Sequence, residues 1–432
     1  MTAEIGILNK EAVAADSAVT VSDIGGQKIF SSANKLFALS KYHPVGVMVF
    51  GRASFMGVPW ETLIKLYRSR LGKKSFPTLQ QYAQDLISFL ETERSLSPEA
   101  EQRRYVHHTL VSYLRLVQQD FMKAAEAALK QRRRLSAVQF GRIAGKVVRE
   151  HSARVRARPR LPGLPRQHAR AVGERYSEAI RQAIQDVFEK LPITTPSMNR
   201  LRRLGGEIFC RDLFPSSTAG LVIAGFGSSD LFPSLVSFQL EAVVADKLKY
   251  RAEITQTIDP ETNSAAVLTF AQSEMVSTFM EGIDPELAQC MNAYLNKVFV
   301  NYPGVIVDSI GGLDDAAKGE LTRKLAAATQ TLFTDYSKRM QTYRRERHVD
   351  PIVRVVAHLP KDELGAMAES LVSLTSFKRR ITMEAETVGG PIDVALISKG
   401  DGFIWIKRKH YFKAELNAQF FANYYRETAD GQ

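Results

Sequence analysis

Thr2 is the residue whose position alone could support covalent chemistry, because it becomes the first residue of the chain once Met1 is removed. An N-terminal threonine can act as a nucleophile, since its free α-amine, with a pKa of about 8, can accept the hydroxyl proton near neutral pH. No separate histidine is then required. Methionine removal tolerates a second residue as small as threonine. On this dipeptide alone the ordinary interpretation is a frayed terminus, so the hypothesis depends on the rest of the chain.

The other reactive side chains give no comparable signal. Cys210 and Cys290 are far apart, with no CxxC spacing and no nearby pair of histidines. This predicts two reduced thiols and argues against both a disulfide framework and a zinc site. The glycines of segment 225–230 lack the lysine and the helix signature of a phosphate-binding loop, so we predict a turn between strands. We expect no cofactor and no metal, and an ATPase acting with this chain would be a separate protein.

The positive charge is concentrated in one segment. Residues 131–175 contain 13 Lys and Arg against two acidic residues, and the rest of the chain is almost neutral, with 45 against 44. The tract Arg132–Arg175 could therefore hold a polyanion or an acidic partner. The alternative is a solvated helix face that leads into a loop. Nucleic acid is the weaker choice of partner, because Phe140 is the only aromatic residue before Tyr176 and base stacking needs interleaved aromatics.

The whole chain has an ordinary globular composition. Its 432 residues are 45% apolar, which is ample for a large core. No stretch approaches about 18 uninterrupted apolar residues, and the first 20 residues do not combine a basic start with a long apolar run. We therefore expect a soluble, unexported, cytoplasmic protein with no membrane segment.

The elements that must position Thr2 alternate between strand-rich and helical stretches. Short apolar runs separated by turn residues predict strands in the first 50 residues, beginning with a hairpin that turns at Asn9–Glu11. The run Val45–Phe50 predicts a strand that is buried on both faces. An apolar stripe from Trp60 to Leu71 predicts a helix lying on the sheet.

The later strands follow the same logic. They are predicted at 219–226, 235–240 and 265–270, and a helix is predicted over Lys361–Ser376. The turn Lys399–Gly402 predicts a closing hairpin between strands 392–398 and 403–407.

Several segments resemble the β subunits of proteasomes. Ala14–Thr20 resembles the AADSxxT stretch after the first hairpin of that family, and Ser32–Phe37 resembles the strand that presents its active-site lysine. Val47–Gly51 resembles the strand that ends in the oxyanion-hole glycine. Further on, Leu221–Phe226 is similar to the central IAGxD-type strand. The closing segments Val388–Leu396 and Asp401–Ile404 are similar to the SGGxVxLxxV strand and the DGW hairpin.

The resemblance covers about 230 residues and implies an α+β fold, the four-layer αββα sandwich of N-terminal-nucleophile (Ntn) hydrolases, with two largely helical insertions. The division it implies is an Ntn core in three parts (1–76, 204–272 and 351–432), a helical basic insertion (77–203) and a second helical insertion (273–350).

The resemblance also assigns roles at the site. Asp16 would hold Lys35 by a charged hydrogen bond, and the Lys35 ammonium would stabilise the ionised hydroxyl of Thr2. The N–H of Gly51 would bind the oxyanion of the tetrahedral intermediate. The accessory serine and acid of the family have no clean match, and Ser273 and Glu386 are the nearest candidates. The spacing from Thr2 to Asp16 is about two residues shorter than usual, which preserves the pairing only if the loss falls at the turn.

The leading hypothesis is a threonine protease of proteasome-like type, a hydrolase that cleaves amide bonds in a peptide or protein substrate (proteolysis). It would work as a homo-oligomer, with a separate ATP-dependent unfoldase as a further expected partner. Two alternatives stay open. One is a catalytically inactive proteasome-like scaffold, and the other is a protein that binds an anionic polymer or nucleic acid through the basic tract.

Overall fold

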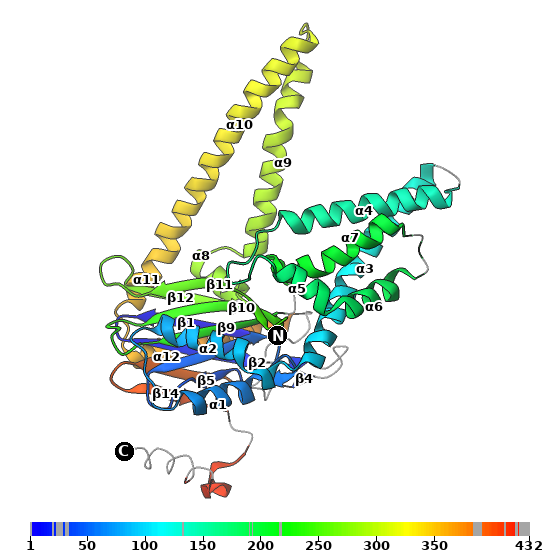
Figure 1. The fold of residues 1–432 in the computed structure, drawn as a ribbon. Helices are drawn as coiled ribbons and strands as arrows, with labels where there is room; N and C mark the ends of the chain where they lie inside the picture. The colour runs from blue at the N-terminus through cyan, green and yellow to red at the C-terminus, as the bar shows by residue number, and fades with distance from the viewer. Residues whose placement is uncertain are drawn as a thin grey trace. The chain divides into compact units, whose positions relative to one another are not determined.

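A computed structural model describes residues 2–19, 21–22, 29–30, 34–131, 134–189, 191, 193–215, 218–382, 391–409, 412–419 and 422. The chain divides into two compact units, and each contains one five-stranded sheet (Figure 1). Unit 1 comprises Met1–Leu36, Leu231–Ser234 and Thr257–Gln432. Unit 2 comprises Phe37–Asp230 and Leu235–Gln256.

The sheet of unit 1 is antiparallel and has the strand order β12-β1-β2-β13-β14. The two ends of the chain therefore meet in this sheet. Strands from the start of the chain pair with strands from residues 265–271 and from the last 40 residues. The strands are β1 (Thr2–Asn9), β2 (Ala12–Val19), β12 (Ala265–Ala271), β13 (Asp393–Ser398) and β14 (Gly402–Lys407). A separate two-stranded ribbon joins β3 (Val21–Ser22) to β4 (Ile29–Phe30). Both predicted terminal hairpins are confirmed.

The first hairpin is tight because Asn9 organises its turn. The Oδ1 atom of Asn9 accepts hydrogen bonds from the N–H groups of Glu11 (3.0 Å) and Ala12 (3.2 Å). Its Nδ2 group donates to the carbonyl oxygens of Val356 and Leu359 at the end of a helix. Only Lys10 and Glu11 connect the strands, and the pairing then runs in a single register to Thr2 opposite Val19.

The helices of unit 1 pack on one face of this sheet. Ala3, Ile5 and Ile7 of β1 join Leu364 and Val372 in one buried cluster, so alternate residues of β1 face the helices. The elements concerned are α8 (Glu274–Glu281), the π-helical turn η3 (Arg345–Val349), α11 (Asp350–Val356) and α12 (Lys361–Ile381). The predicted helix start behind Pro360 is confirmed.

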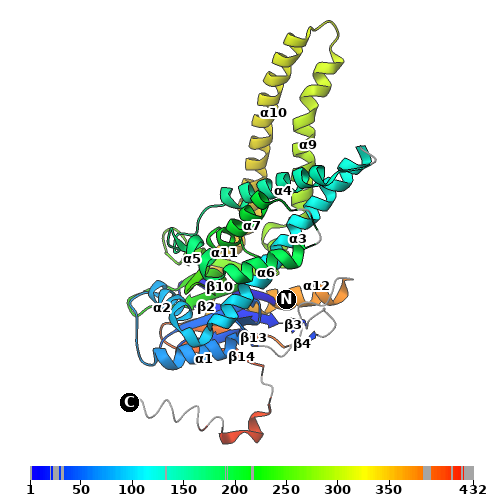
Figure 2. The same cartoon turned by 45° about the vertical axis from the view of Figure 1, so that its right-hand side comes forward.

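A long helical hairpin, α9 (Pro285–Ser309) and α10 (Asp315–Arg344), extends away from the sheet of unit 1 (Figures 1 and 2). The two helices pack on each other, with the rings of Phe299 and Phe333 5.7 Å apart. Among the described residues α9 buries only Pro303 and Val307, and α10 buries none. Most of the surface of this hairpin is thus open to other contacts.

The sheet of unit 2 has the order β11-β10-β9-β6-β5. The predicted helix after Val45–Phe50 is confirmed as α1 (Trp60–Leu71), which buries the whole predicted apolar stripe, and α2 (Leu79–Thr92) follows it. The strands are β5 (Leu36–Ala38), β6 (Val45–Gly51), β9 (Ala219–Gly225), β10 (Ser234–Val244) and β11 (Lys247–Thr257). A short ribbon pairs β7 (Ser54–Phe55) with β8 (Val58–Pro59).

The rest of unit 2 is helical. Long α3 (Glu99–Gln131) packs on α6, and α4 lies beside α7 (Figure 1). The helices are α4 (Ala137–Ala157), α5 (His168–Arg175), α6 (Ser177–Phe188) and α7 (Thr195–Glu207), with 3-10 turns at η1 (Arg94–Leu96) and η2 (Ile208–Cys210). A further turn, η4 (Ala414–Leu416), lies in unit 1. The apolar residues of the unit 2 helices share one core with the sheet of unit 2.

These elements confirm the α+β class. The αββα stacking and the five-part domain division stay predictions. Strand β11 was not predicted, because its first half reads Lys247, Lys249 and Arg251 at every second position and its apolar pattern is weak. Of the two cysteines, Cys210 is buried and Cys290 is exposed.

Candidate active site

One end of the unit 1 sheet gathers the start of the chain and several other strand ends. The first residue of β1, Thr2, lies opposite Val19 at the end of β2. Ala3 lies opposite Ala271, the last residue of β12, and the chain reaches Ser273 two residues later. The start of β13 and the end of β14 meet at the same end, with Val394 opposite Lys407. Chain segments that are distant in sequence thus converge near Thr2.

Glu4 and Lys35 place two charged side chains in the interior of this region. Glu4 is 1% exposed and Lys35 is 3% exposed. Glu4 lies between Ala3 and Ile5, which face the helices, so its own side chain lies on the other face of the sheet. Among the described residues neither carboxylate oxygen of Glu4 has a hydrogen-bond partner. Burying this carboxyl group in its ionised form is therefore costly, and the charges of Lys35 and Lys409 offset that cost only in part.

Burial dominates the protonation of both groups. It raises the pKa of Glu4 to about 8, although the charges of Lys35 and Lys409 act in the opposite direction. Burial also lowers the pKa of Lys35, which the Glu4 carboxylate partly offsets and the Lys409 charge reinforces. The two groups therefore hold protons with much more similar affinity than a free glutamate and a free lysine do.

Asp393 and Lys409 complete a cluster of four charges. Asp393 and Glu4 both lie opposite Ser17, one on each side of β2, so a single row across three strands carries both acids. The backbone N–H of Lys409 donates to Asp393 Oδ1 at 2.8 Å, and its Nζ lies 3.4 Å from Oδ2. Burial raises the pKa of Asp393, and the nearby Lys409 opposes that rise. Among the residues whose side chains the structure describes, this cluster brings two acids and two lysines together.

The structure places the other predicted site residues as follows. The backbone of Asp16 lies opposite Ile5 on one side and Val394 on the other, one position along β2 from the row of acids. Ser273 is the residue immediately before α8, at the end of the sheet where β1 begins. Glu386 lies outside the described residues. The roles proposed for these three stay predictions.

Gly51 belongs to unit 2, where it ends β6 opposite Ala219. Its φ of +75° is in the left-handed region, and a Cβ atom there would overlap the carbonyl oxygen of Thr218. Only glycine satisfies both conditions. The backbone at this position therefore has a special conformation, which fits a residue whose N–H must point in an unusual direction. Its assignment to the oxyanion hole stays a prediction.

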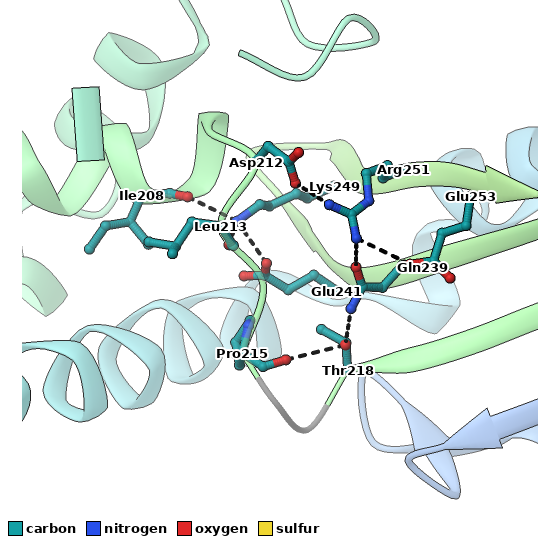
Figure 3. Close-up of polar contacts among 10 residues, drawn as sticks. All are labelled: Ile208, Asp212, Leu213, Pro215, Thr218, Gln239, Glu241, Lys249, Arg251 and Glu253. Atoms are coloured by element: carbon teal, nitrogen blue, oxygen red, sulfur yellow. Dashed lines mark hydrogen bonds and ion pairs between the residues drawn. The ribbon is translucent and has the colours of Figure 1, made fainter. Parts of the chain in front are cut away.

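A polar network, buried at Lys249 and Glu241 and partly exposed elsewhere, includes Thr218, the residue that lies against Gly51 (Figure 3). Gln239 donates to Thr218 Oγ1 (2.8 Å) and accepts from Arg251 (2.7 Å), and Arg251 also pairs with Asp212 (2.7 Å). The Nζ of Lys249 donates to the carbonyl oxygens of Ile208 (2.9 Å) and Leu213 (2.7 Å).

Lys249 also forms a fully buried ion pair with Glu241, with Nζ 2.7 Å from Oε2. These contacts hold Ile208, Asp212, Leu213 and Thr218 in place, and Thr218 is the residue that a Cβ atom at Gly51 would overlap.

The sequence analysis missed Glu4, Asp393 and Lys409. The alternation of β1 gives Glu4 the appearance of a solvent-facing residue. Asp393 lies inside a segment read for its family pattern, and Lys409 follows the last predicted strand. A charged residue two positions after the proposed nucleophile is the one signal that could have been used.

The described part of the chain contains no candidate metal-ion site and no candidate membrane-spanning helix. Its His, Cys, Asp and Glu side chains form no group of three or more that could hold a metal ion. None of its helices combines the length and the apolar character needed to cross a membrane.

Comparison with known proteins gives distant structural similarity only. No protein-family model matches the chain, and no curated protein sequence matches it. Solved structures align over most of the chain. Anbu (ancestral beta-subunit) from Yersinia bercovieri has 9% identity, and the alignment covers 99% of this chain and 96% of that one, with a TM-score of 0.27. The helical assembly of the Anbu complex from Pseudomonas aeruginosa has 8% identity, coverage of 99% and 96%, and a TM-score of 0.27. Scores this low do not establish a common fold.

Proposed function

We propose that this chain is a threonine-type Ntn hydrolase that cleaves amide bonds in peptides. The observation that carries the proposal is the buried Glu4–Lys35 pair, in which Glu4 lies two residues after Thr2 on the same strand. Two strand residues span about 7 Å, so a lysine that interacts with Glu4 is near the start of the strand. A lysine ammonium near Thr2 suits a site where the threonine oxygen must carry negative charge as its hydroxyl loses its proton.

In the proposed reaction the Thr2 hydroxyl oxygen attacks the substrate carbonyl carbon while its proton passes to the free α-amine of Thr2. The tetrahedral intermediate collapses as the C–N bond breaks, and the departing amine takes the proton. An ester between Thr2 and the acyl group remains. Water, deprotonated by the same α-amine, hydrolyses this ester and restores the hydroxyl. Lys35 stabilises the developing negative charge on the Thr2 oxygen, and Glu4 sets how readily Lys35 holds its proton.

Self-assembly is part of the proposal, and it is supported by the surface of α9. Leu287, Met291, Tyr294, Val298, Tyr302 and Val305 follow spacings of four and three residues along this helix, and each is at least 39% exposed. An apolar stripe with this period is typical of a helix that packs on another helix. We infer that the partner is a second copy of this chain.

The decisive experiment compares the wild-type protein with Thr2→Ala and Thr2→Ser. Intact mass first establishes whether Thr2 is the mature terminus. Hydrolysis of a set of fluorogenic peptides should be lost in the alanine variant and partly kept in the serine variant, which retains a hydroxyl. Retained Met1 together with absent hydrolysis would instead identify an inactive scaffold. Hydrolysis unaffected by Thr2→Ala would contradict the proposal outright.

A further inference from the structure

A groove in unit 2 lies between α4 and the start of α7, and the functional site does not use it. The two helices approach closely, since a Cβ atom at Gly145 would lie 3.6 Å from the hydroxyl of Ser197. The groove between them encloses about 790 Å³. This volume is large enough to hold several residues of an extended peptide.

Four basic residues line the groove, and none of the described residues lining it is acidic. Arg142, Lys146 and Arg149 recur at i, i+4 and i+7 on α4, so they share one face, and Arg200 comes from α7. The cations therefore converge from two helices. Their mutual repulsion is unfavourable in the empty groove and would be relieved by an anionic ligand.

Some basic residues of unit 2 are paired with acids. Arg175 lies 2.6 Å from Asp246, Arg251 lies 2.7 Å from Asp212, and several further arginines have similar partners. In contrast, no described carboxylate lies within 4.0 Å of Arg142, Arg149 or Arg200. Lys146 has only Glu150, at 3.9 Å. Other arginines of unit 2, such as Arg156 and Arg202, also lack a described carboxylate within 4.0 Å, so what distinguishes the groove is that four basic residues from two helices line one cavity.

The remaining lining decides between kinds of anion. The apolar residues Ala137, Val138, Ile193 and Pro196 border the same groove, and Val138 is 66% exposed. A polyphosphate has no apolar group to place against them. A nucleic acid would need aromatic residues for base stacking, and the lining has none. An acidic peptide offers both carboxylates for the arginines and an apolar side chain for this wall.

We propose that the groove between α4 and α7 binds an acidic peptide segment of a partner protein. Carboxylates of the segment contact the three arginines and Lys146, and one apolar side chain packs on Val138. The backbone N–H groups at the start of α7 add to an attraction that the four side chains already supply. This interaction is independent of the chemistry proposed at Thr2.

The test uses the full-length protein and a fluorescein-labelled peptide of sequence DEDLEDE, with binding followed by fluorescence anisotropy. The combined variant Arg142→Gln, Arg149→Gln and Arg200→Gln should weaken binding by about a hundredfold or more, at about tenfold for each charged hydrogen bond. The matched control, Arg103→Gln, Arg134→Gln and Arg166→Gln, removes the same charge from exposed positions outside the groove and should change binding less than about threefold.

Two further arms test the class of ligand. A peptide with serine in place of leucine should bind wild type less tightly than the leucine peptide does. The Val138→Ser variant should bind both peptides equally, because it lacks the apolar surface that the leucine would contact. Sodium tripolyphosphate and heparin should compete only weakly. Equal loss in the groove and control variants would show that net charge alone drives binding and would overturn the proposal. Tighter binding of either polyanion than of the peptide would overturn the choice of an acidic peptide.

Discussion

The chemical behaviour of Lys35 depends on its burial. A lysine in water keeps its proton far above neutral pH, but removal from water destabilises the ammonium form and lowers the pKa of this side chain. Glu4 partly restores the charged form. The pair is balanced so that small changes in either partner alter the protonation of both. Substitutions at these two residues therefore test the proposed chemistry more sharply than substitutions that only remove bulk.

We expect Lys35→Ala to reduce peptide hydrolysis nearly as far as Thr2→Ala, and Lys35→Arg to give no rescue. Guanidinium is larger and spreads its charge, so it fits the space less well and stabilises the charge on the Thr2 oxygen less well. The measurement is kcat/KM on a fluorogenic peptide. Lys10→Arg, at an exposed position in the first hairpin turn, is the matched control and should leave kcat/KM unchanged. Wild-type turnover by Lys35→Arg would exclude Lys35 from the site.

Glu4 should make the stability of unit 1 depend on pH. Its folded-state pKa of about 8 lies above the ordinary value of 4.5, so the folded state binds the extra proton between these pH values. Stability contributed by protonated Glu4 is complete below about pH 4.5 and is lost as the pH rises through 8. Glu4→Gln stays neutral, and its free energy of unfolding relative to wild type should therefore rise over this range, by up to about 1.4 kcal/mol per pH unit.

Urea unfolding at several pH values between about 5 and 8 measures this difference. Glu11→Gln is the control, because Glu11 is exposed in the adjacent turn and should show no such slope. A flat difference between Glu4→Gln and wild type would mean that Glu4 is ionised in the folded protein throughout. The role proposed for it beside Lys35 would then fail.

At the scale of elements, the sequence was informative where one face of an element is apolar and the other polar. The stripe of α1 follows such a pattern, whereas the closing hairpin β13–β14 was predicted from its turn Lys399–Gly402. Both were predicted close to their observed bounds. Strand β11 was missed because Lys249 is charged and yet buried, so burial and polarity do not correspond there. Its ion pair with Glu241 makes this possible, and a partner on another strand leaves no local trace in the sequence.

Local sequence patterns likewise indicated only some of the residues of the candidate site. Thr2, Asp16 and Lys35 could be proposed from local segments, because each lies in a stretch with a recognisable pattern. Glu4, Asp393 and Lys409 could not be grouped, because only strand pairing between the two ends of the chain brings them together. The sequence of one segment does not determine how it pairs with a strand far away along the chain.

Gly51, the last residue of β6, gives a prediction about backbone conformation. Gly51→Ala should destabilise unit 2 by about 3 kcal/mol or more, since the left-handed φ of +75° adds to an overlap with the Thr218 carbonyl. Gly57→Ala separates the two effects: Gly57 has a φ of +83°, but its Cβ would meet nothing nearer than 3.8 Å. We expect this control to lose only about 1 kcal/mol. Chemical unfolding measures both, and equal losses would show that the overlap is relieved by movement of Thr218.

At the scale of the whole molecule, α9 and α10 are the part of the chain that is hardest to explain for a monomer. A hairpin of 25 and 30 residues buries little of itself within unit 1, and it exposes a continuous apolar stripe on α9. Isolated exposed apolar residues are normal in soluble proteins, but continuous stripes usually mark contact surfaces. The stripe therefore predicts association through α9.

We expect the protein to be an oligomer larger than a dimer at micromolar concentration, as measured by light scattering after size exclusion. The combined variant Tyr294→Gln, Val298→Gln and Tyr302→Gln should weaken association by about a hundredfold or more, because each buried apolar side chain contributes about 1.5–3 kcal/mol. Leu116→Gln, Met122→Gln and Leu129→Gln replace three similarly exposed apolar residues on α3 and should leave the mass unchanged. A wild-type monomer at low salt would contradict self-assembly. An oligomer that dissociates only in the α3 variant would place the interface in unit 2 and not on α9.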